Sequence, residues 1–284
     1  MQFRGHPPLS RGALYALLDL CRSAAAAIVD HYDPSDERAP FWRKDDRSPL
    51  TEADLASHRI LAAGLAEITP ELPLLSEESA PEDIAGRREW TRFWMVDPLD
   101  GTREFLERSG EFTINVALVD AQRPVLGILY QPLEQRAYLG VVGEGAWTLR
   151  PDGSGWQSES LHTRSLPEDT LVLLASRRHR NARLNTCIEL LGAERRLERR
   201  NSGSAVKFCD LAAGLGDCYP RFSPCSEWDV AAGDALVTAA GGALWGLDGK
   251  PLRYNARDTL LSRHFVAVGD SANPLWPRLM RALS

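Results

Sequence analysis

The sequence predicts an α+β fold, and three features of the chain indicate this class. Residues 10–32 carry apolar side chains at helical spacing, and residues 112–142 hold short apolar or alternating runs divided by turn residues. Spacings of three and four residues mark one face of a helix, whereas alternation over a few residues marks a half-buried strand. The second half of the chain mixes both kinds of run, so helices and strands are expected throughout.

Length and composition bound the organisation of the chain. At 284 residues it is long enough for two mid-sized domains, which we place at 1–160 and 161–284. Hydrophobic residues make up 44% and charged residues 25%, as in ordinary soluble globular proteins. The net charge of −6 argues against a nucleic-acid polymer as partner, because such binders are usually basic. The net charge does not exclude a small anionic substrate.

The cysteines and the N-terminal region bear on the cellular compartment. The five cysteines are scattered and form no C-x-x-C pair; they are Cys21, Cys187, Cys209, Cys218 and Cys225. This pattern is neither a disulfide framework nor a zinc signature, and it indicates reduced thiols in a cytoplasmic protein. Asp19 and Arg22 interrupt the first apolar stretch, so we expect neither a signal peptide nor a transmembrane segment. Peripheral association with the cytoplasmic face of the inner membrane stays open, as does the choice between monomer and dimer.

Two helices are expected near the N-terminus. The first spans about residues 10–32, with an apolar face made by Leu14, Leu18, Cys21, Ala25, Ile28 and Tyr32. Residues 33–36 end this helix, and residues 44–49 form a polar loop. Thr51 is the expected N-cap of the second helix, with Asp54 in the capping-box position. Asp54 therefore has two interpretations, a helix cap or a carboxylate that positions a water molecule.

The pattern that most strongly indicates a chemical function consists of two carboxylates close in sequence. The apolar run 93–96 predicts a short buried strand that ends in Asp97 and Asp100. Pro98 fixes φ and Gly101 frees it, so the chain turns and both carboxylates can face one point. Their oxygens suit a hard cation such as Mg²⁺, and a helix opening after the glycine would favour a phosphate beside it. The alternative is an ordinary surface turn, where Asp, Pro and Gly are common.

Further oxygen ligands would have to come from other segments. The sequence S-E-E-S at 76–79 ends a short apolar run, and it is either a solvated loop or a source of such ligands. Strands are expected as an antiparallel meander at 112–119, 123–130 and 136–142. Residues 151–155 predict a flexible polar connection near the domain border.

The second half is expected to alternate strands and helices. Strands are predicted at 171–175, 217–222, 243–247 and 264–268, the last of them finishing the fold. Helices are predicted up to about residue 191, at 207–213 and from residue 228, where Asp229 lies in the first turn. The basic residues within 195–200 are interpreted as a solvated face.

Four motifs, taken in their order along the chain, resemble the inositol monophosphatase superfamily of Mg²⁺-dependent, lithium-sensitive phosphatases. They are T-E-A-D at 51–54, S-E-E-S at 76–79, D-P-L-D-G-T at 97–102 and W-D-V-A-A-G at 228–233. The resemblance covers about residues 10–270. It implies a layered αβαβα sandwich with a metal site between the two halves, so neither half alone is expected to be active.

Within that superfamily the chain is most similar to the bacterial 3'(2'),5'-bisphosphate nucleotidases. This similarity rests on Lys44 ahead of S-P-L-T at 48–51, A-S-R-R-H at 175–179, G-S-A-V-K at 203–207 and Y-P-R-F at 219–222. Two departures are visible. Arg178 stands where many relatives have a small residue, and Ala205-Val206 replaces the commoner Ser-Leu.

The resemblance implies a set of metal ligands and catalytic groups. One Mg²⁺ would be held by Glu77, Asp97 and the carbonyl of Leu99. A second would be held by Asp97, Asp100 and Asp229, and a third ion near Asp54 is left open. Asp54 and the hydroxyl of Thr102 would orient and deprotonate the attacking water, with Glu77 as a further catalytic residue. Two ions about 3.5–4 Å apart can clamp the attacking and leaving oxygens of an in-line displacement.

Substrate contacts implied by the same resemblance surround these ligands. The backbone N–H groups of Gly101 and Thr102 would bind phosphate, while Lys207, Arg221 and the 176–179 loop would meet the second phosphate and the base. The basic residues each have a structural or solvated alternative. The full expected set is Glu77, Leu99, Asp100, Gly101, Thr102, Ser176, His179, Ser204, Lys207, Arg221 and Asp229.

The implied activity is hydrolysis of the 3'-phosphate of adenosine 3',5'-bisphosphate, a by-product of sulfate assimilation, to AMP and phosphate. One alternative is an inositol monophosphatase. Another is a non-catalytic member that binds a nucleotide, although buried carboxylates without a cation are costly and argue against it. An RNA-associated role conflicts with the acidic net charge.

Overall fold

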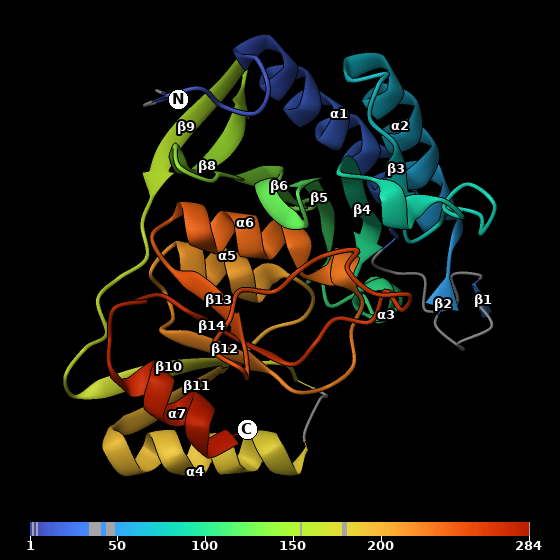
Figure 1. The fold of residues 1–284 in the computed structure, drawn as a ribbon. Coiled ribbons are helices and arrows are strands. Elements are labelled where there is room, and N and C mark those ends of the chain that lie inside the picture. The colour runs from blue at the N-terminus through green and yellow to red at the C-terminus, as the bar shows by residue number, and fades with distance from the viewer. Residues whose placement is uncertain are drawn as a thin grey trace.

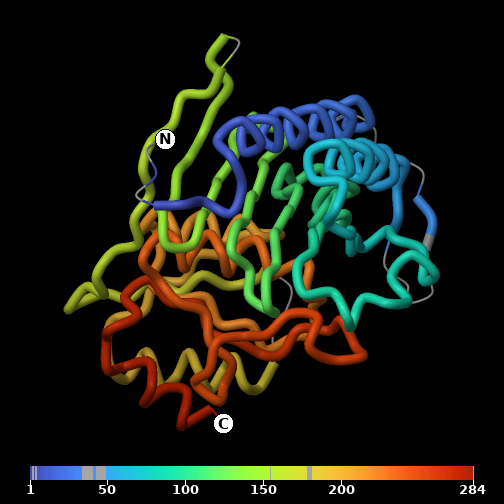
Figure 2. Tube along the Cα trace, turned by 45° about the horizontal axis from the view of Figure 1, so that its top comes forward, coloured from blue at the N-terminus to red at the C-terminus, as the bar shows by residue number. Residues whose placement is uncertain are grey.

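The computed structural model describes residues 1, 3, 5–33, 41–43, 49–153, 155–177 and 181–283. These residues form layers in which helices and two sheets alternate, from α1 and α2 through to α4 and α7 (Figure 1). The view in Figure 2 shows the same order of layers from another direction. The expected α+β class and the αβαβα sandwich are confirmed.

The first layer consists of α1 (Arg11–Asp30) and α2 (Glu52–Ile68), which pack side by side on the first sheet (Figure 1). Ser10 caps α1 by accepting a backbone N–H of its first turn at 3.2 Å. Thr51 and Asp54 form the expected capping box at the start of α2. In the stretch of chain that follows α1 and precedes α2, the two-residue strands β1 (Trp42–Arg43) and β2 (Pro49–Leu50) pair antiparallel. Of the predicted polar loop, residues 44–48 lie outside the described part of the chain.

Helix α1 is shorter by two residues than the predicted end at residue 32. It is the one helix among the described residues that is long and apolar enough to cross a membrane by length and composition. Its apolar side chains are nevertheless part of the protein core; the buried ones are Leu14, Leu17, Leu18, Cys21, Ala24, Ala25 and Ile28. Burial of this face explains its composition without a membrane.

The second layer is a sheet to which the described residues contribute seven strands. They are β3 (Leu74–Ser76), β4 (Arg92–Asp100), β5 (Thr113–Asp120), β6 (Arg123–Gln131), β7 (Arg136–Val141), β8 (Gly145–Asp152) and β9 (Gly155–Leu161). The strands follow one another in chain order, with β3 parallel to β4 and every later pair antiparallel. The predicted meander is therefore confirmed in β5, β6 and β7. The 3₁₀ turn η1 (Arg87–Glu89) precedes β4, and the short helix α3 (Thr102–Leu106) follows it.

Two local predictions in this sheet were wrong. Strand β4 does not end at residue 96 but continues to Asp100, because Asp97 pairs with Asn115 and Asp100 with Thr113 across an irregularity in the register. Such a bulge accommodates Pro98, which has no N–H to give to the ladder. The segment 151–155 lies in the hairpin of β8 and β9, where Asp152 pairs with Gly155, and so it does not connect two domains.

The second sheet lies between two further helix layers. Its strands are β10 (Thr170–Ala175), β11 (Arg196–Asn201), β12 (Cys218–Arg221), β13 (Ala243–Gly246) and β14 (Phe265–Val268), in the order β11-β10-β12-β14-β13. One face is covered by α5 (Val206–Ala212) and α6 (Ala231–Ala239), the other by α4 (Ala182–Glu194) and α7 (Leu275–Leu283) (Figure 1). The 3₁₀ turn η2 (Glu227–Asp229) stands directly before α6. Asp229 therefore lies in this turn, ahead of the α-helix in whose first turn it was predicted.

Two elements of the second half were not predicted. The basic segment 195–200 was expected to be solvated, and its side chains are mostly exposed, but its backbone forms the edge strand β11 beside β10. Helix α7 follows β14, the strand that was expected to finish the fold. Its buried face, which was overlooked, consists of Leu275, Trp276, Leu279, Met280 and Leu283.

Helix α6 belongs to the second half of the chain but packs on the sheet of the first half. Gly127 in β6 and Gly140 in β7 are cross-strand partners beneath it. A Cβ at Gly127 would lie 2.8 Å from the Cα of Ala232, and one at Gly140 would lie 2.9 Å from the carbonyl oxygen of Ala235. The helix backbone thus approaches the sheet as closely as it does because both positions lack a side chain. This contact brings η2, and with it Asp229, to the end of β4.

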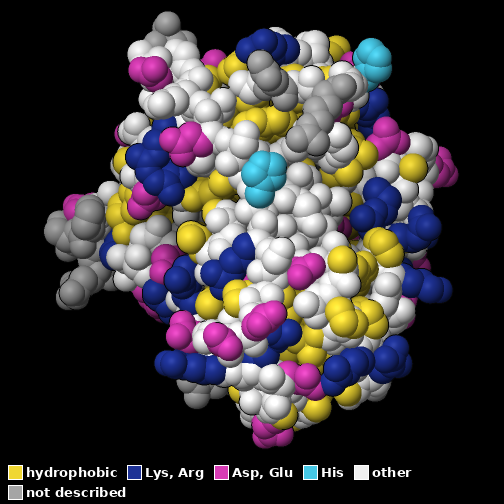
Figure 3. Space-filling model, turned by 90° about the vertical axis from the view of Figure 1, so that its left-hand side faces the viewer, with side chains coloured by type: hydrophobic (Ala, Val, Ile, Leu, Met, Phe, Trp, Pro, Cys, Tyr) yellow, Lys and Arg dark blue, Asp and Glu magenta, His cyan; other side chains and the backbone are white. Residues whose placement is uncertain are grey.

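Three hydrophobic clusters fill the spaces between the layers. One lies under α1 and α2, the second between the two sheets, and the third under α4 and α7. The five cysteines are free, and all but Cys225 are buried. On the face shown in Figure 3, basic and acidic side chains are interspersed, so this face presents no continuous field of one sign.

Candidate active site

Three carboxylates from separate segments converge at the end of β4. Glu77 lies just after β3, where its N–H donates to the carbonyl of Val96 at 3.0 Å. Asp97 lies in β4 and Asp229 in η2. Ligand oxygens of the three residues all lie within 4.8 Å of one another. The structure therefore brings together acidic groups that are about 20 and more than 130 residues apart along the chain.

The electrostatics of this group match a cation site. Burial raises the pKa of Asp97 well above its ordinary value, and Glu77 and Asp100 raise it further. The pKa of Asp229 is also raised well above its ordinary value, first by burial and then by Asp100 and Glu77. Several carboxylates in one buried place repel one another unless a cation is bound. An all-oxygen donor set of this charge fits a hard divalent ion such as Mg²⁺.

Asp100 lies beside this group, and part of its carboxylate is engaged by the second half of the chain. Its Oδ2 accepts hydrogen bonds from the Ser204 hydroxyl at 2.6 Å and the Ala205 N–H at 2.7 Å. The side-chain amide of Asn115 donates to the same oxygen at 3.3 Å. Asp100 therefore contributes to the contact between the halves, and its part in holding a second ion stays a prediction.

Asp54 caps α2, as the first of its two interpretations predicted, and its other carboxylate oxygen contacts Thr102 in the site, while its role in positioning a water molecule stays a prediction. Its Oδ2 accepts from the Thr51 N–H at 2.8 Å and the Thr51 hydroxyl at 2.5 Å. Its Oδ1 accepts from the Thr102 hydroxyl at 3.1 Å. Burial raises the pKa of Asp54 to about 6, against the lowering effect of the Thr51 hydrogen bonds. A carboxylate of this kind can accept a proton near neutral pH.

The turn after β4 has the geometry that its sequence predicts. Gly101 adopts a φ of +92°, and a Cβ there would lie 3.1 Å from the carbonyl oxygen of Glu111. The Leu99 N–H donates to Asp97 Oδ1 at 3.1 Å, while the Leu99 carbonyl can accept from the Thr102 hydroxyl at 3.2 Å. These bonds fix the carboxylate, the carbonyl and the hydroxyl relative to one another.

Two adjoining cavities meet at Asp100 and Asp229. Glu77, Asp97, Leu99, Thr102 and Ser176 are among the residues that line the first. The second extends into the other half and is lined by Ser176, Ser204, Lys207, Tyr219, Arg221 and Phe265, among others. An acidic site thus opens directly into a pocket with two cationic side chains and aromatic walls.

The expected substrate contacts differ in the hydrogen bonds that they already make within the protein. The ammonium group of Lys207 is buried and donates to the carbonyls of Ser202, at 3.0 Å, and Ser204, at 2.5 Å. Burial lowers the pKa of Lys207 to about 8, against the raising effect of Asp100. Arg221 donates to the carbonyls of two residues just after it, at 3.3 and 3.2 Å. Lys207 therefore also holds the loop that carries Ser204.

Two further observations concern the expected contacts. The hydroxyl of Ser204, besides its bond to Asp100, lies 2.8 Å from the hydroxyl of Thr113. His179 and Arg178 lie outside the described residues. Sequence reasoning missed Glu111, whose carboxylate accepts from Arg177 at 2.5 Å and from the Gly203 N–H at 2.6 Å. A single acidic residue ahead of a strand gives no sequence signal for such a contact.

Comparison with known proteins places these features in context. The model of the inositol monophosphatase family matches residues 13–275. The 3'(2'),5'-bisphosphate nucleotidase CysQ of Salmonella typhimurium strain LT2 is 37% identical over 257 residues, which cover 89% of this chain and 98% of that protein. CysQ of Escherichia coli strain K12 is 38% identical over 251 residues, covering 87% of this chain and 95% of that protein.

Solved structures agree with the sequence matches. The crystal structure of CysQ from Bacteroides thetaiotaomicron superposes with a TM-score of 0.78 at 38% identity and covers 91% of this chain and 97% of that one. The inositol monophosphatase TM1415 of Thermotoga maritima gives a TM-score of 0.71 at 21% identity, covering 94% of both chains. The second likeness concerns the fold alone.

Proposed function

The chain belongs to the inositol monophosphatase family, and from this premise we propose that it is a 3'(2'),5'-bisphosphate nucleotidase. Its reaction would be hydrolysis of the 3'-phosphate of adenosine 3',5'-bisphosphate to AMP and inorganic phosphate. The observation that carries the proposal is the acidic group of Glu77, Asp97 and Asp229 opening into a pocket with Lys207 and Arg221. Similarity to two CysQ nucleotidases over nearly the whole chain supports the same substrate class.

The metal site in this proposal is built from this chain's own oxygens. Glu77, Asp97 and the Leu99 carbonyl would hold one Mg²⁺, and Asp97, Asp100 and Asp229 a second, with a third near Asp54 left open. When bound, the metal supplies Lewis-acid stabilisation of the charge that develops on the phosphoryl group. The side chains that gather here supply carboxylate oxygens, which are the ligands such ions prefer.

The residues around the metal site would orient the reactants and accept a proton. The Thr102 hydroxyl donates to Asp54 Oδ1, so its own oxygen is left able to accept a hydrogen bond from a water molecule. Asp54 would take one proton of that water as the water oxygen bonds to the phosphorus and the bond between the phosphorus and the 3'-oxygen breaks, and the released 3'-oxygen would take up a proton from solvent. Thr51 holds the other oxygen of Asp54 and so fixes the direction in which Oδ1 points. Glu77 would take part as a metal ligand.

The second cavity would receive the remainder of the nucleotide. Arg221 offers a cation for the second phosphate, and the aromatic walls of Tyr219 and Phe265 suit a base. Lys207 would act both on the anion and through the loop that it holds. The proposed domains 1–160 and 161–284 each supply part of this site, so neither is expected to be active alone. A cytoplasmic location and inhibition by lithium are also proposed.

A comparison of two substrates tests the function. Phosphate release is measured with adenosine 3',5'-bisphosphate and with inositol 1-phosphate at equal concentration in the presence of Mg²⁺. We expect the nucleotide to be turned over with the higher kcat/KM. Equal or better turnover of the inositol ester would favour an inositol monophosphatase, and tight nucleotide binding without any turnover would favour a non-catalytic member.

The pKa values of the metal-free site predict proton release on Mg²⁺ binding. The pKa of Asp54 is about 6, and those of Asp97 and Asp229 are raised well above their ordinary values. Carboxylates must lose their protons to bind a cation, so Mg²⁺ binding should release protons and Mg²⁺ affinity should rise with pH as these carboxylates ionise. Calorimetry at pH 6 in buffers of different ionisation enthalpy should show protons released on binding. Mg²⁺ binding without proton release would contradict this prediction.

A further inference from the structure

A buried network of polar contacts joins the segment that begins with Glu77 to the segment that carries Asp229. It consists of Arg87 in η1, Asn255 in the loop between β13 and β14, and Glu227 in η2. We propose that these three residues, here called the Arg87 latch, are positioning residues that set the distance between Glu77 and Asp229. The proposal rests on the proposed metal-dependent function, because its effect is exerted on the carboxylates of that site.

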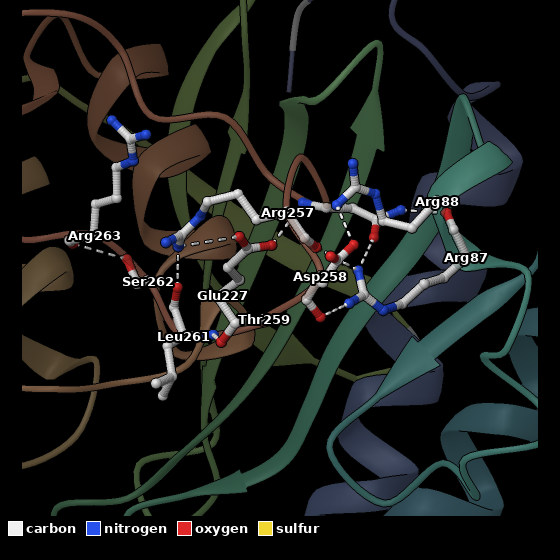
Figure 4. A network of polar contacts seen from close by, with 10 residues as sticks. Arg87, Arg88, Glu227, Arg257, Asp258, Thr259, Leu261, Ser262 and Arg263 are labelled. Carbon is white, nitrogen blue, oxygen red and sulfur yellow. Dashed lines mark hydrogen bonds and ion pairs between the residues drawn. The ribbon is translucent and has the colours of Figure 1, made fainter.

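The first step of the latch ties the two halves of the molecule together. Arg87 is 8% exposed, and its guanidinium donates to the side-chain oxygen of Asn255 and to the carbonyls of Arg257, at 3.2 Å, and Asp258. The side-chain amide of Asn255 donates back to the Arg87 carbonyl. Figure 4 shows the side chain of Arg87 extending to Asp258, with Glu227 and Arg257 on the far side of Asp258 from Arg87. A planar guanidinium with several donors suits this geometry, whereas a lysine offers only a point charge.

The second step connects Asn255 to the turn that carries Asp229. The backbone N–H of Asn255 donates to Glu227 Oε2 at 2.6 Å, and Glu227 is 2% exposed. Glu227 is two residues ahead of Asp229, and its own N–H donates to the carbonyl of Leu260 at 2.8 Å. The guanidinium of Arg257 faces the other oxygen of Glu227 at 4.0 Å (Figure 4). The segment from Asn255 to Leu260 therefore contacts Glu227 in η2 through backbone groups and through the side chain of Arg257.

The opposite end of the latch acts on Glu77. Glu77 and Arg87 are ten positions apart, and the backbone between them makes local turns, such as the one closed by the hydrogen bond from the Asp83 N–H to the Ala80 carbonyl. The start of this segment is held on β4 by the Glu77 N–H, and its end is held by Arg87 on the second half. The segment from Glu77 to Arg87 is thus held at both ends, by β4 beside the carboxylates and by the second half of the chain at the latch.

The physical need for such a device follows from the charges. Ligand oxygens of Glu77, Asp97 and Asp229 all lie within 4.8 Å of one another, so the negative charges of the three carboxylates repel one another before a cation arrives. They come from different halves, so this repulsion acts to separate the halves. A latch of buried, charge-assisted hydrogen bonds opposes that separation and keeps the ligand spacing in place. Preorganised ligands bind a cation more tightly than ligands that must be brought together.

Arg87→Gln and Asn255→Gly test the latch, and Arg88→Gln is the matched control. Arg88 is adjacent, and its ion pair with Asp258 is exposed, which predicts little effect. Asn255 has a φ of +54°, so glycine keeps its backbone conformation while removing the side chain that Arg87 contacts. Mg²⁺ affinity is measured by calorimetry without substrate, the fold is checked by circular dichroism, and KM for the nucleotide is measured at saturating Mg²⁺.

We expect Arg87→Gln and Asn255→Gly to raise the Kd for Mg²⁺ by about tenfold or more, as for outer contacts that orient metal ligands. The KM for the nucleotide should stay within about twofold, and Arg88→Gln should bind Mg²⁺ as the unaltered protein does. Folded variants with unchanged Mg²⁺ affinity would overturn the latch while leaving the proposed function intact. Failure of both variants to fold would also overturn it, because residues that only space two carboxylates leave the cores of both halves intact. If the unaltered protein bound no Mg²⁺, the proposed metal site would fall together with the latch.

Discussion

Asp97→Asn is expected to lower kcat/KM by at least about 10³-fold. In the proposed site this carboxylate is shared between two ions, and metal stabilisation of the transition state amounts to several kcal/mol. Each loss of about 1.4 kcal/mol costs about tenfold in rate. The Asn side chain keeps an oxygen that can accept from the Leu99 N–H, so the turn after β4 should keep its shape. Steady-state kinetics at saturating Mg²⁺ measure the effect.

Although Asp97→Asn lowers activity, it is expected to stabilise the metal-free protein. The folded-state pKa of Asp97 is raised above its unfolded value, so between the two values the folded state binds more protons and stability falls as pH rises. Wherever this carboxylate is ionised, its charge therefore destabilises the metal-free fold. Asp97→Asn removes that charge and should raise the melting temperature without Mg²⁺, while reducing the further rise that Mg²⁺ produces.

The control for this pair of effects is Asp152→Asn, which removes an exposed carboxylate in the β8–β9 hairpin. It should change neither turnover nor the response of the melting temperature to Mg²⁺. If Asp97→Asn kept turnover within about threefold of the unaltered protein, Asp97 would not be a metal ligand. A melting temperature that responded to Mg²⁺ as before would count against it equally.

The features of the site that the sequence allowed us to predict are local ones. The capping box of Thr51 and Asp54 and the positive φ of Gly101 follow from a few adjacent residues, and the structure contains both. The convergence of Glu77, Asp97 and Asp229 depends on the packing of separate segments, and it was predicted from the family resemblance alone. Contacts such as Glu111 with Gly203 carry no pattern, because a hydrogen bond between distant loops leaves no periodicity in either.

The missed elements have physical reasons of their own. Strand β11 consists largely of exposed arginine and glutamate, since an edge strand tolerates charge on both faces and charge there discourages pairing with other chains. Its hydrogen bonds to β10 therefore have no counterpart in hydrophobic alternation. Helix α7 did carry a signal, because its buried residues recur at helical spacing. Strand β4 was predicted to be too short because Pro98 normally ends a strand, and here a bulge accommodates it.

Gly127→Ala is expected to destabilise the fold and to reduce activity together. The added Cβ would lie 2.8 Å from the Cα of Ala232, which belongs to the backbone of α6 and cannot rotate away. Overpacking of this kind typically costs about 1–3 kcal/mol. Relief of the clash would displace α6 from the sheet, and Asp229 stands just ahead of that helix. The spacing of the carboxylates should therefore change as well as the stability.

Urea unfolding and the apparent Mg²⁺ affinity measure the two effects of Gly127→Ala separately. Gly192→Ala is the matched control, because Gly192 lies in α4 and a Cβ there would meet no atom within 4 Å. In a helix interior, alanine is favoured over glycine by up to about 1 kcal/mol, so the control should shift the urea midpoint upward. A Gly127→Ala protein as stable as the unaltered one would show that the close approach of α6 to the sheet is not needed. Reduced stability with unchanged Mg²⁺ affinity would mean that α6 supports the fold without setting the position of Asp229.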